Sequence, residues 1–146
     1  MEFVRITKSE EIENLVNEFL PYLPHLLKKI EDVSAFAEKL AKFAWVVVVK
    51  KQNENASMIV FYSNDFETKC GYFTLLATKP ESRRQGLIKY LFQFGFNQMK
   101  KDGMEKARLE VDCDNIRAKT MYEKMGFVYE SDTDRNSIYM KKDLKD

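Results

Sequence analysis

Six consecutive residues in the middle of the chain, 83–88, have the sequence Arg-Arg-Gln-Gly-Leu-Ile and are suited to binding a phosphate. They follow the apolar run 72–77 and precede an amphipathic stretch to about Met99, so the pattern predicts a strand, a short loop and a helix. The first N–H groups of a helix have no intrahelical partner and lie at the positive end of its dipole. Gly86 would let an anion approach closely, and the two arginines would add charge-assisted hydrogen bonds. We therefore expect an anion-binding loop, with a solvated helix cap as the alternative.

A second motif begins about thirty residues further along the chain. The short run 109–111 is followed by the segment 115–127, which has the pattern Asn-x-x-Ala-x-x-x-Tyr-x-x-x-Gly-Phe. Together with Arg-x-x-Gly-x-Ile in 83–88, this pattern resembles the GCN5-related N-acetyltransferase superfamily, in its coenzyme A loop and its following strand–helix motif. The resemblance is specific from about Gly71 to Tyr129 and only topological outside that range.

The resemblance implies acetyl-CoA as co-substrate and no metal. The backbone of 76–78 would pair with the pantetheine arm, and Asn115 would contact the same arm, a role compatible with an ordinary helix N-cap. The family usually has Gly or Ala where this chain has Ile88, which either crowds the phosphate or, as its helical stripe with Phe92 and Met99 favours, packs into the core. The cofactor-binding residues expected on this basis are Leu76, Ala77, Thr78, Arg83, Arg84, Gln85, Gly86, Leu87, Ile88, Asn115, Ala118 and Tyr122.

The reaction implied by the resemblance is direct transfer of an acetyl group to a primary amine. Tyr122 matches the position of the family's general acid, whose phenol would protonate the departing thiolate. Many members carry a Glu on the strand before the loop, but residues 69–76 contain no carboxylate. Glu110 on the next strand is therefore the expected catalytic base, with Glu67 as an alternative. A structural hydrogen bond or a solvated sheet face is the competing interpretation of Glu110.

Periodicity and turn signals predict a mixed α/β sheet with helices on both faces. Ser9 is the expected N-cap of the first helix, and a loop of about five residues should join the second and third strands. The predicted strands are 2–7, 45–50, 57–63, 69–78, 106–112, 127–130 and 137–142, and the predicted helices are 9–20, 26–43, one from the loop to about 101, and 115–125. This order, β-α-α-β-β-β-α-β-α-β-β, is also that of the family. The resemblance alone implies that the strands 69–78 and 106–112, parallel neighbours, splay apart.

Composition is consistent with one domain over residues 1–146. The 24 basic and 23 acidic residues give a net charge near +1, so we expect neither a nucleic-acid nor a membrane partner. The longest apolar run, 43–49, is too short to span a bilayer, and the first residues lack a secretory pattern, so a cytoplasmic protein is expected. The two cysteines are expected to be reduced thiols, and no metal-ligand cluster is evident.

The acceptor is the main feature that the sequence leaves open. In the family, the first helices and the last hairpin shape the acceptor site, here 19–36, which includes His25, and 132–139. A small-molecule amine and a protein amine both remain open, as do a monomer and a homodimer. Two other functional classes also remain: a non-catalytic acyl-CoA-binding or regulatory domain, and an unrelated α/β interaction domain.

Overall fold

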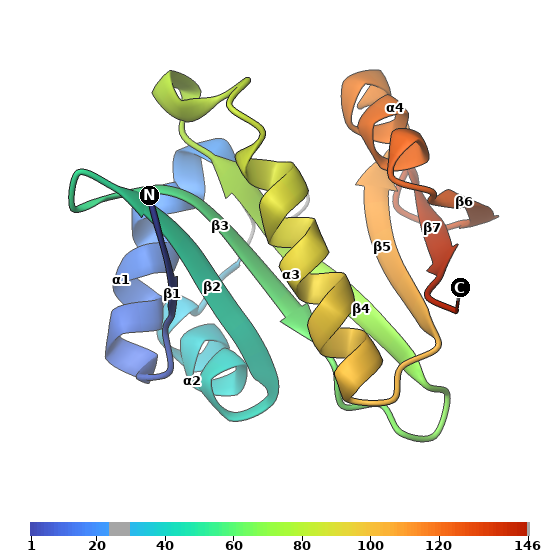
Figure 1. Ribbon diagram of the computed structural model, residues 1–146, viewed down its shortest axis with the longest axis horizontal. Coiled ribbons are helices and arrows are strands. Elements are labelled where there is room, and N and C mark those ends of the chain that lie inside the picture. Colours follow the sequence, from blue (N-terminus) through green and yellow to red (C-terminus); the bar gives the residue numbers. More distant parts are fainter. Residues whose placement is uncertain (24–29, 146) are drawn as a thin grey trace.

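The computed structural model describes residues 1–23 and 30–145, which form a seven-stranded sheet flanked by helices (Figure 1). The strands lie in the order β1-β2-β3-β4-β5-β7-β6, and only the β4–β5 pair is parallel. In chain order the elements are β1 Glu2–Arg5, α1 Ser9–Phe19, the 3-10 turn η1 Leu20–Tyr22, α2 Val33–Phe43, β2 Ala44–Lys51, β3 Glu54–Tyr62, β4 Cys70–Thr78, the 3-10 turn η3 Pro80–Ser82, α3 Leu87–Lys101, β5 Lys106–Asp112, α4 Ile116–Lys124, β6 Val128–Asp132 and β7 Ser137–Asp143. The predicted mixed fold and its element order are confirmed.

Some predicted boundaries near the amino-terminal end are wrong. Lys8, not Ser9, is the N-cap of α1, and it makes no side-chain capping bond. The second helix begins only at Val33, because the side chain of Asp32 caps it by accepting the N–H of Ala35 at 2.9 Å. Of the predicted start of this helix, residues 26–29 lie outside the described residues.

The β2–β3 hairpin is tighter than predicted. Its turn consists of Gln52 and Asn53, which both have positive φ, 54° and 65°. Two central residues of this kind match the twist of a hairpin, and a bulge at Val49/Lys50 keeps the polar residues on either side of the turn in register. The predicted five-residue loop therefore corresponds to a two-residue turn, since polar residues at the ends of two strands continue to pair.

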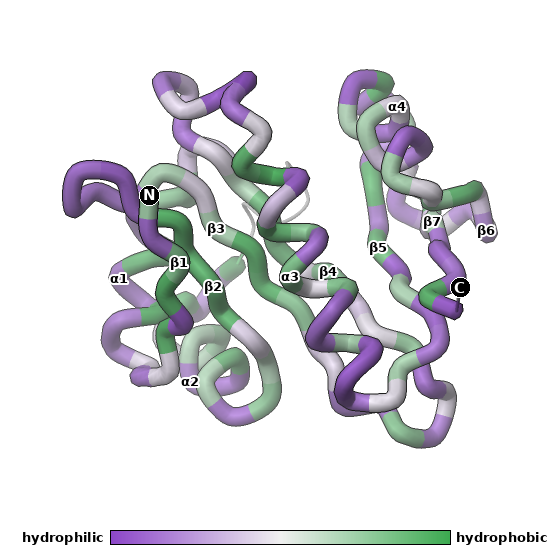
Figure 2. Tube along the Cα trace, viewed as in Figure 1, coloured by the Kyte–Doolittle hydropathy of each residue, from purple (hydrophilic) through white to green (hydrophobic). Residues whose placement is uncertain are grey.

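Two apolar layers cover opposite faces of the sheet. Helices α1 and α2 pack with Val46, Val60 and Leu75 on one face, and α3 packs with alternate strand residues, including Phe61 and Phe73, on the other. Helix α4 lies on the same face as α3, since it adds partly buried side chains to that layer. Figure 2 shows hydrophobic residues concentrated along β2 and β3 and hydrophilic residues at the turns.

Strands β4 and β5 remain paired over only four residues, from Cys70↔Lys106 to Phe73↔Leu109. Beyond this point β4 continues along β3, and β5 continues along β7. Figure 1 shows the two strands separating toward the ends that lead into α3 and α4. The splay that the resemblance implied is therefore present in this chain.

Gly95 on α3 offers a test of how tightly this helix is seated. A Cβ at this position would lie 2.6 Å from Cε1 and 2.9 Å from Cζ of Phe73, whose ring also packs 4.7 Å from that of Phe92. Gly95→Ala should therefore lower the free energy of unfolding by about 1–2 kcal/mol, because overpacking costs about 1–3 kcal/mol and helix propensity returns at most about 1 kcal/mol.

Urea unfolding measures this difference, with Gln93→Ala on the exposed face of α3 as the control, expected within about 0.5 kcal/mol of the parent. A stabilised Gly95→Ala variant would contradict the close packing of α3 against Phe73.

Candidate active site

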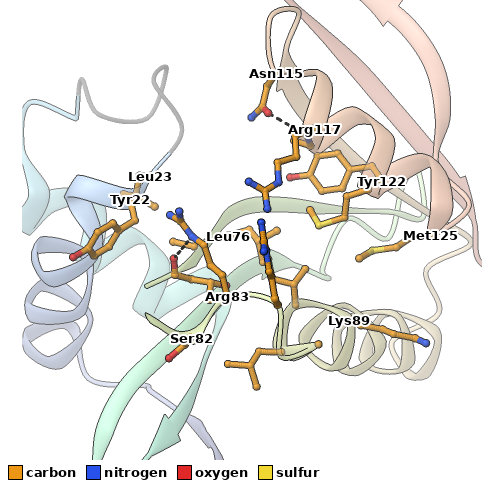
Figure 3. A pocket seen from close by; sticks show the side chains of 18 residues that line it. Tyr22, Leu23, Leu76, Ser82, Arg83, Lys89, Asn115, Arg117, Tyr122 and Met125 are labelled. Atoms are coloured by element: carbon orange, nitrogen blue, oxygen red, sulfur yellow. Dashed lines mark hydrogen bonds between the residues drawn. The ribbon is translucent and has the colours of Figure 1, made fainter. Parts of the chain in front are cut away.

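A cavity of about 610 Å³ lies where β4 and β5 separate (Figure 3). The end of β4 and the loop into α3 form one wall, α4 forms the other, and Tyr22 and Leu23 lie at its edge. The predicted residues that line it are Leu76, Ala77, Thr78, Arg83, Arg84, Gly86, Leu87, Ile88, Asn115, Ala118 and Tyr122. Gln85 and Glu110 are not among the lining residues. The structure thus brings most of the two predicted motifs to one cavity.

The loop before α3 has the backbone shape of an anion site. Arg84 and Gly86 both adopt positive φ, 65° and 74°, and Gly86 is the N-cap of α3. This conformation turns the chain sharply into the helix, whose first N–H groups then have no intrahelical acceptor. A Cβ at Gly86 would meet no atom within 4 Å, so the space beside this backbone is open. The conformation fits the predicted anion-binding loop.

Two contacts fix the loop to its neighbours. The Nε of Arg83 donates a hydrogen bond to the backbone carbonyl of Thr78, at 3.3 Å. The Nζ of Lys51, at the end of the β2–β3 hairpin, donates to the Oε1 of Gln85. The side chain of Gln85 is thereby held outside the cavity, and only its backbone remains available to a ligand.

Ile88 packs against the core, as its helical stripe favoured, and it also borders the cavity. Its half-buried side chain lies against the layer that contains Phe92. It forms part of an apolar wall next to the loop, and Gly86 leaves the backbone itself uncovered.

Helix α4 supplies the opposite wall. Asn115 is its N-cap, and the side-chain oxygen accepts the N–H of Ala118 at 3.1 Å. Tyr122 packs edge-on against Phe92 and Phe127, with ring centroids 5.9 and 6.0 Å away. Burial raises the pKa of Tyr122 to about 12, so its phenol stays protonated at neutral pH. The site thus contains a buried O–H donor.

Glu110 lies on the other face of the sheet. Its neighbours on β5, Leu109 and Val111, point into the layer beneath α3, so Glu110 points away from it. Its carboxylate accepts hydrogen bonds from Nε and Nη2 of Arg135, both at 3.2 Å, and from the hydroxyl of Ser137. Its side chain is only 10% exposed, whereas that of Arg135 is 51% exposed. Arg135 therefore covers the predicted base.

Two further side chains lie close to this ion pair. The Tyr139 hydroxyl accepts a hydrogen bond from Nη2 of Arg135 at 3.1 Å. Burial first, and then the charge of Glu110, raise the pKa of Tyr72 to about 12. The surroundings of Glu110 therefore consist of one guanidinium, the hydroxyls of Ser137 and Tyr139, and the ring of Tyr72.

The other candidates are not brought to this cavity. Glu67 precedes the end of β4 that stays paired with β5, which is the end opposite to Leu76. His25 lies outside the described residues. Within the described part of the chain, no group of three His, Cys, Asp or Glu side chains is placed to hold a metal ion. No described helix is both long enough and apolar enough to cross a membrane.

Residues 9–127 match the Acetyltransferase (GNAT) family. The chain belongs to this family. Residues 83–88 and 115–127, which carry the cavity's two main walls, both lie within the matched range.

Two curated GNAT relatives are similar over a short region. N-alpha-acetyltransferase 30 of Schizosaccharomyces pombe is 39% identical over 39% of this chain and 38% of its own length. Mycothiol acetyltransferase of Streptomyces griseus is 36% identical over 42% of this chain and 20% of its own length. The chain therefore matches well under half the length of either relative.

Solved structures extend the similarity of fold to nearly the whole chain. The smu.2055 protein of Streptococcus mutans superposes with a TM-score of 0.81 at 17% identity, over 99% of this chain and 100% of that one. The PaiA N-acetyltransferase of Thermoplasma acidophilum, solved in complex with coenzyme A, gives a TM-score of 0.72 at 20% identity, over 98% and 99% of the two chains.

Several residues that line the cavity of this GNAT chain escaped sequence reasoning. Arg117 and Met121 come from α4, Met125 is the C-cap of that helix, and Lys89 comes from α3. The α4 residues share a helical face with Ala118 and Tyr122, because they recur at intervals of three or four. That periodicity was visible in the sequence, and it would have identified them once α4 was assigned to the wall of a cavity.

Proposed function

We propose that this chain is an acetyl-CoA-dependent N-acetyltransferase, which moves an acetyl group directly to a primary amine. One observation carries the proposal: a single cavity joins the arginine-bearing first turn of α3 to the buried phenol of Tyr122. Coenzyme A needs these two features at its opposite ends, cations and N–H groups at the diphosphate and a proton donor near the sulfur.

The edge of β4 would hold the arm that connects these ends. Past Phe73, the side of β4 that faces β5 pairs with no strand in the described part of the chain. An extended amide-bearing arm can add to such an edge through main-chain hydrogen bonds at Leu76, Ala77 and Thr78. The Thr78 carbonyl already accepts the Arg83 side chain and the Ala77 carbonyl accepts the hydroxyl of Ser57, so Leu76 has the greatest capacity for the ligand. The N–H of Leu76 is our candidate for polarising the thioester carbonyl.

In the proposed reaction the amine nitrogen attacks the thioester carbonyl carbon, the carbon–sulfur bond breaks, and the amine loses a proton. Tyr122 donates a hydrogen bond to the leaving sulfur. Its pKa of about 12 lies above the ordinary thiol value of about 8.5, so Tyr122 stabilises the thiolate mainly as a donor and does not fully protonate it. Glu110 receives the amine proton, directly or through a water in the gap between β4 and β5.

A non-catalytic acyl-CoA-binding domain is the second candidate. The ion pair between Glu110 and Arg135 favours it, because a carboxylate held by a guanidinium is a poor proton acceptor. Calorimetry with acetyl-CoA, followed by a thiol-release assay with small amines and free amino-terminal peptides, separates the two candidates. Binding with thiol release supports the enzyme; binding without release across the panel supports the domain.

The loop is tested by a matched pair at Gly86. Asn and Asp have nearly the same shape and both tolerate positive φ, so Gly86→Asn and Gly86→Asp differ mainly in charge. Gly86→Asp should weaken acetyl-CoA binding about a hundredfold or more, since like charges in contact cost several kcal/mol. Gly86→Asn should stay within about fivefold of the parent, a small penalty for the added side chain. Equal affinities of the two variants in calorimetry would place the diphosphate elsewhere.

The phenol is tested by Tyr122→Phe, which removes one hydroxyl from a buried ring. Turnover should fall about tenfold to a hundredfold, while the dissociation constant for acetyl-CoA changes less than about twofold, the pattern of an interaction made in the transition state. Tyr90→Phe, on a ring that is 56% exposed, is the control and should leave both quantities unchanged. A parallel loss of affinity in Tyr122→Phe would make the phenol a binding group only.

The base is tested by breaking the same ion pair from either side. Glu110→Gln removes the carboxylate and should lower kcat/KM about a hundredfold, within the usual range for a general base. Arg135→Gln also removes the pair but leaves the carboxylate, so kcat/KM should equal or exceed that of the parent. If steady-state kinetics show the same loss in both variants, the pair acts by supporting the turn between β6 and β7.

A further inference from the structure

The candidate cavity is strongly cationic. Arg83, Arg84, Lys89 and Arg117 line it, and no Asp or Glu is among its lining residues in the described part of the chain. None of these four side chains makes an ion pair with a described residue. Because the chain as a whole has a net charge of only +1, this excess of positive charge is local to the cavity.

Arg117 enters the cavity from the wall opposite the loop. Figure 3 shows its guanidinium extending from α4 into the space between the two walls, whereas the Arg83 side chain points toward Leu23 and Tyr22. A guanidinium that lines a cavity without a carboxylate partner is stabilised when an anion binds beside it. The cavity therefore offers cations on two walls, at the first turns of α3 and α4.

The position of Arg117 along α4 separates it from the reacting end of the cavity. It lies in the first turn of the helix and is exposed, whereas Tyr122 is five residues further along and partly buried. At 1.5 Å per residue the two positions are about 7.5 Å apart along the helix axis. Arg117 would therefore meet a ligand whose thioester reaches Tyr122 at a part of that ligand away from the reacting carbonyl.

Coenzyme A carries two separate phosphate groups, a diphosphate and a phosphomonoester on the ribose. The N–H groups of the loop, with Arg83 and Arg84, suffice for the two charges of the diphosphate. We propose that Arg117 forms a second phosphate subsite, which binds the ribose phosphomonoester of the coenzyme. This subsite rests on the proposed function, since it requires the coenzyme to occupy the cavity.

Calorimetric titration with coenzyme A and with 3′-dephospho-coenzyme A tests the subsite. The parent should bind coenzyme A about tenfold more tightly than the dephospho form. This ratio is at the lower end of the affinity that a charge-assisted hydrogen bond contributes, because Arg117 is exposed. Arg117→Ala should reduce this preference to less than about twofold, by weakening coenzyme A binding while leaving the dephospho form unchanged. Arg117→Lys should keep part of the preference, since it keeps the charge and loses the bidentate geometry.

Lys119→Ala is the matched control, because it removes a cation from the same helix at a position that does not line the cavity. It should retain the parent's preference. The subsite is overturned if the parent shows no preference, if Arg117→Ala keeps the parent's preference or weakens both ligands equally, or if Lys119→Ala loses as much of it as Arg117→Ala. Failure of the parent to bind either ligand would instead refute the proposed function, and the subsite with it.

Discussion

The architecture of the site depends on the point at which β4 stops pairing with β5. A bulge at Thr74 marks this point: Phe61 pairs with Phe73, and the next residue of β3, Val60, pairs with Leu75. In a regular strand residues 73 and 75 would share a face, but here Phe73 packs beneath α3 and Leu75 packs beneath α1 and α2. The bulge therefore turns Leu76 toward the cavity, past the last pair that joins β4 to β5.

The same separation places the two proposed catalytic groups on different faces. Tyr122 belongs to the layer beneath α3, and Glu110 lies on the opposite face, which α1 and α2 cover over β2, β3 and β4. A sheet in which β4 and β5 were paired along their whole length would keep these faces apart, whereas the gap between the two strands connects them. In the proposed reaction the coenzyme and the amine therefore approach the thioester from opposite sides, and Arg135 is the group that an incoming cationic amine meets at the carboxylate.

Local sequence signals predicted the middle of the chain well. The β5 boundaries and the Asn115 cap follow from alternation and capping chemistry, both of which act within a few residues. The predicted N-cap of α1 was wrong because neighbouring residues near Ser9 offered equivalent starting points for the helix. The predicted hairpin loop was too long because the polar residues next to Gln52 continue the strands. Glu110 shows a different limit, because its partner Arg135 is 25 residues away and meets it only through the β5–β7 pairing.

The rest of the fold holds the loop before α3 in a strained conformation. A non-glycine residue at positive φ, here Arg84, costs about 1–3 kcal/mol, and unpaired cations around the cavity add repulsion. The loop cannot relax freely, because α3 is anchored below it by Phe92 and Phe96, whose rings pack on Phe73. A rigid loop with free N–H groups loses little conformational entropy when an anion binds, so the aromatic core beneath α3 contributes to affinity without contacting the ligand.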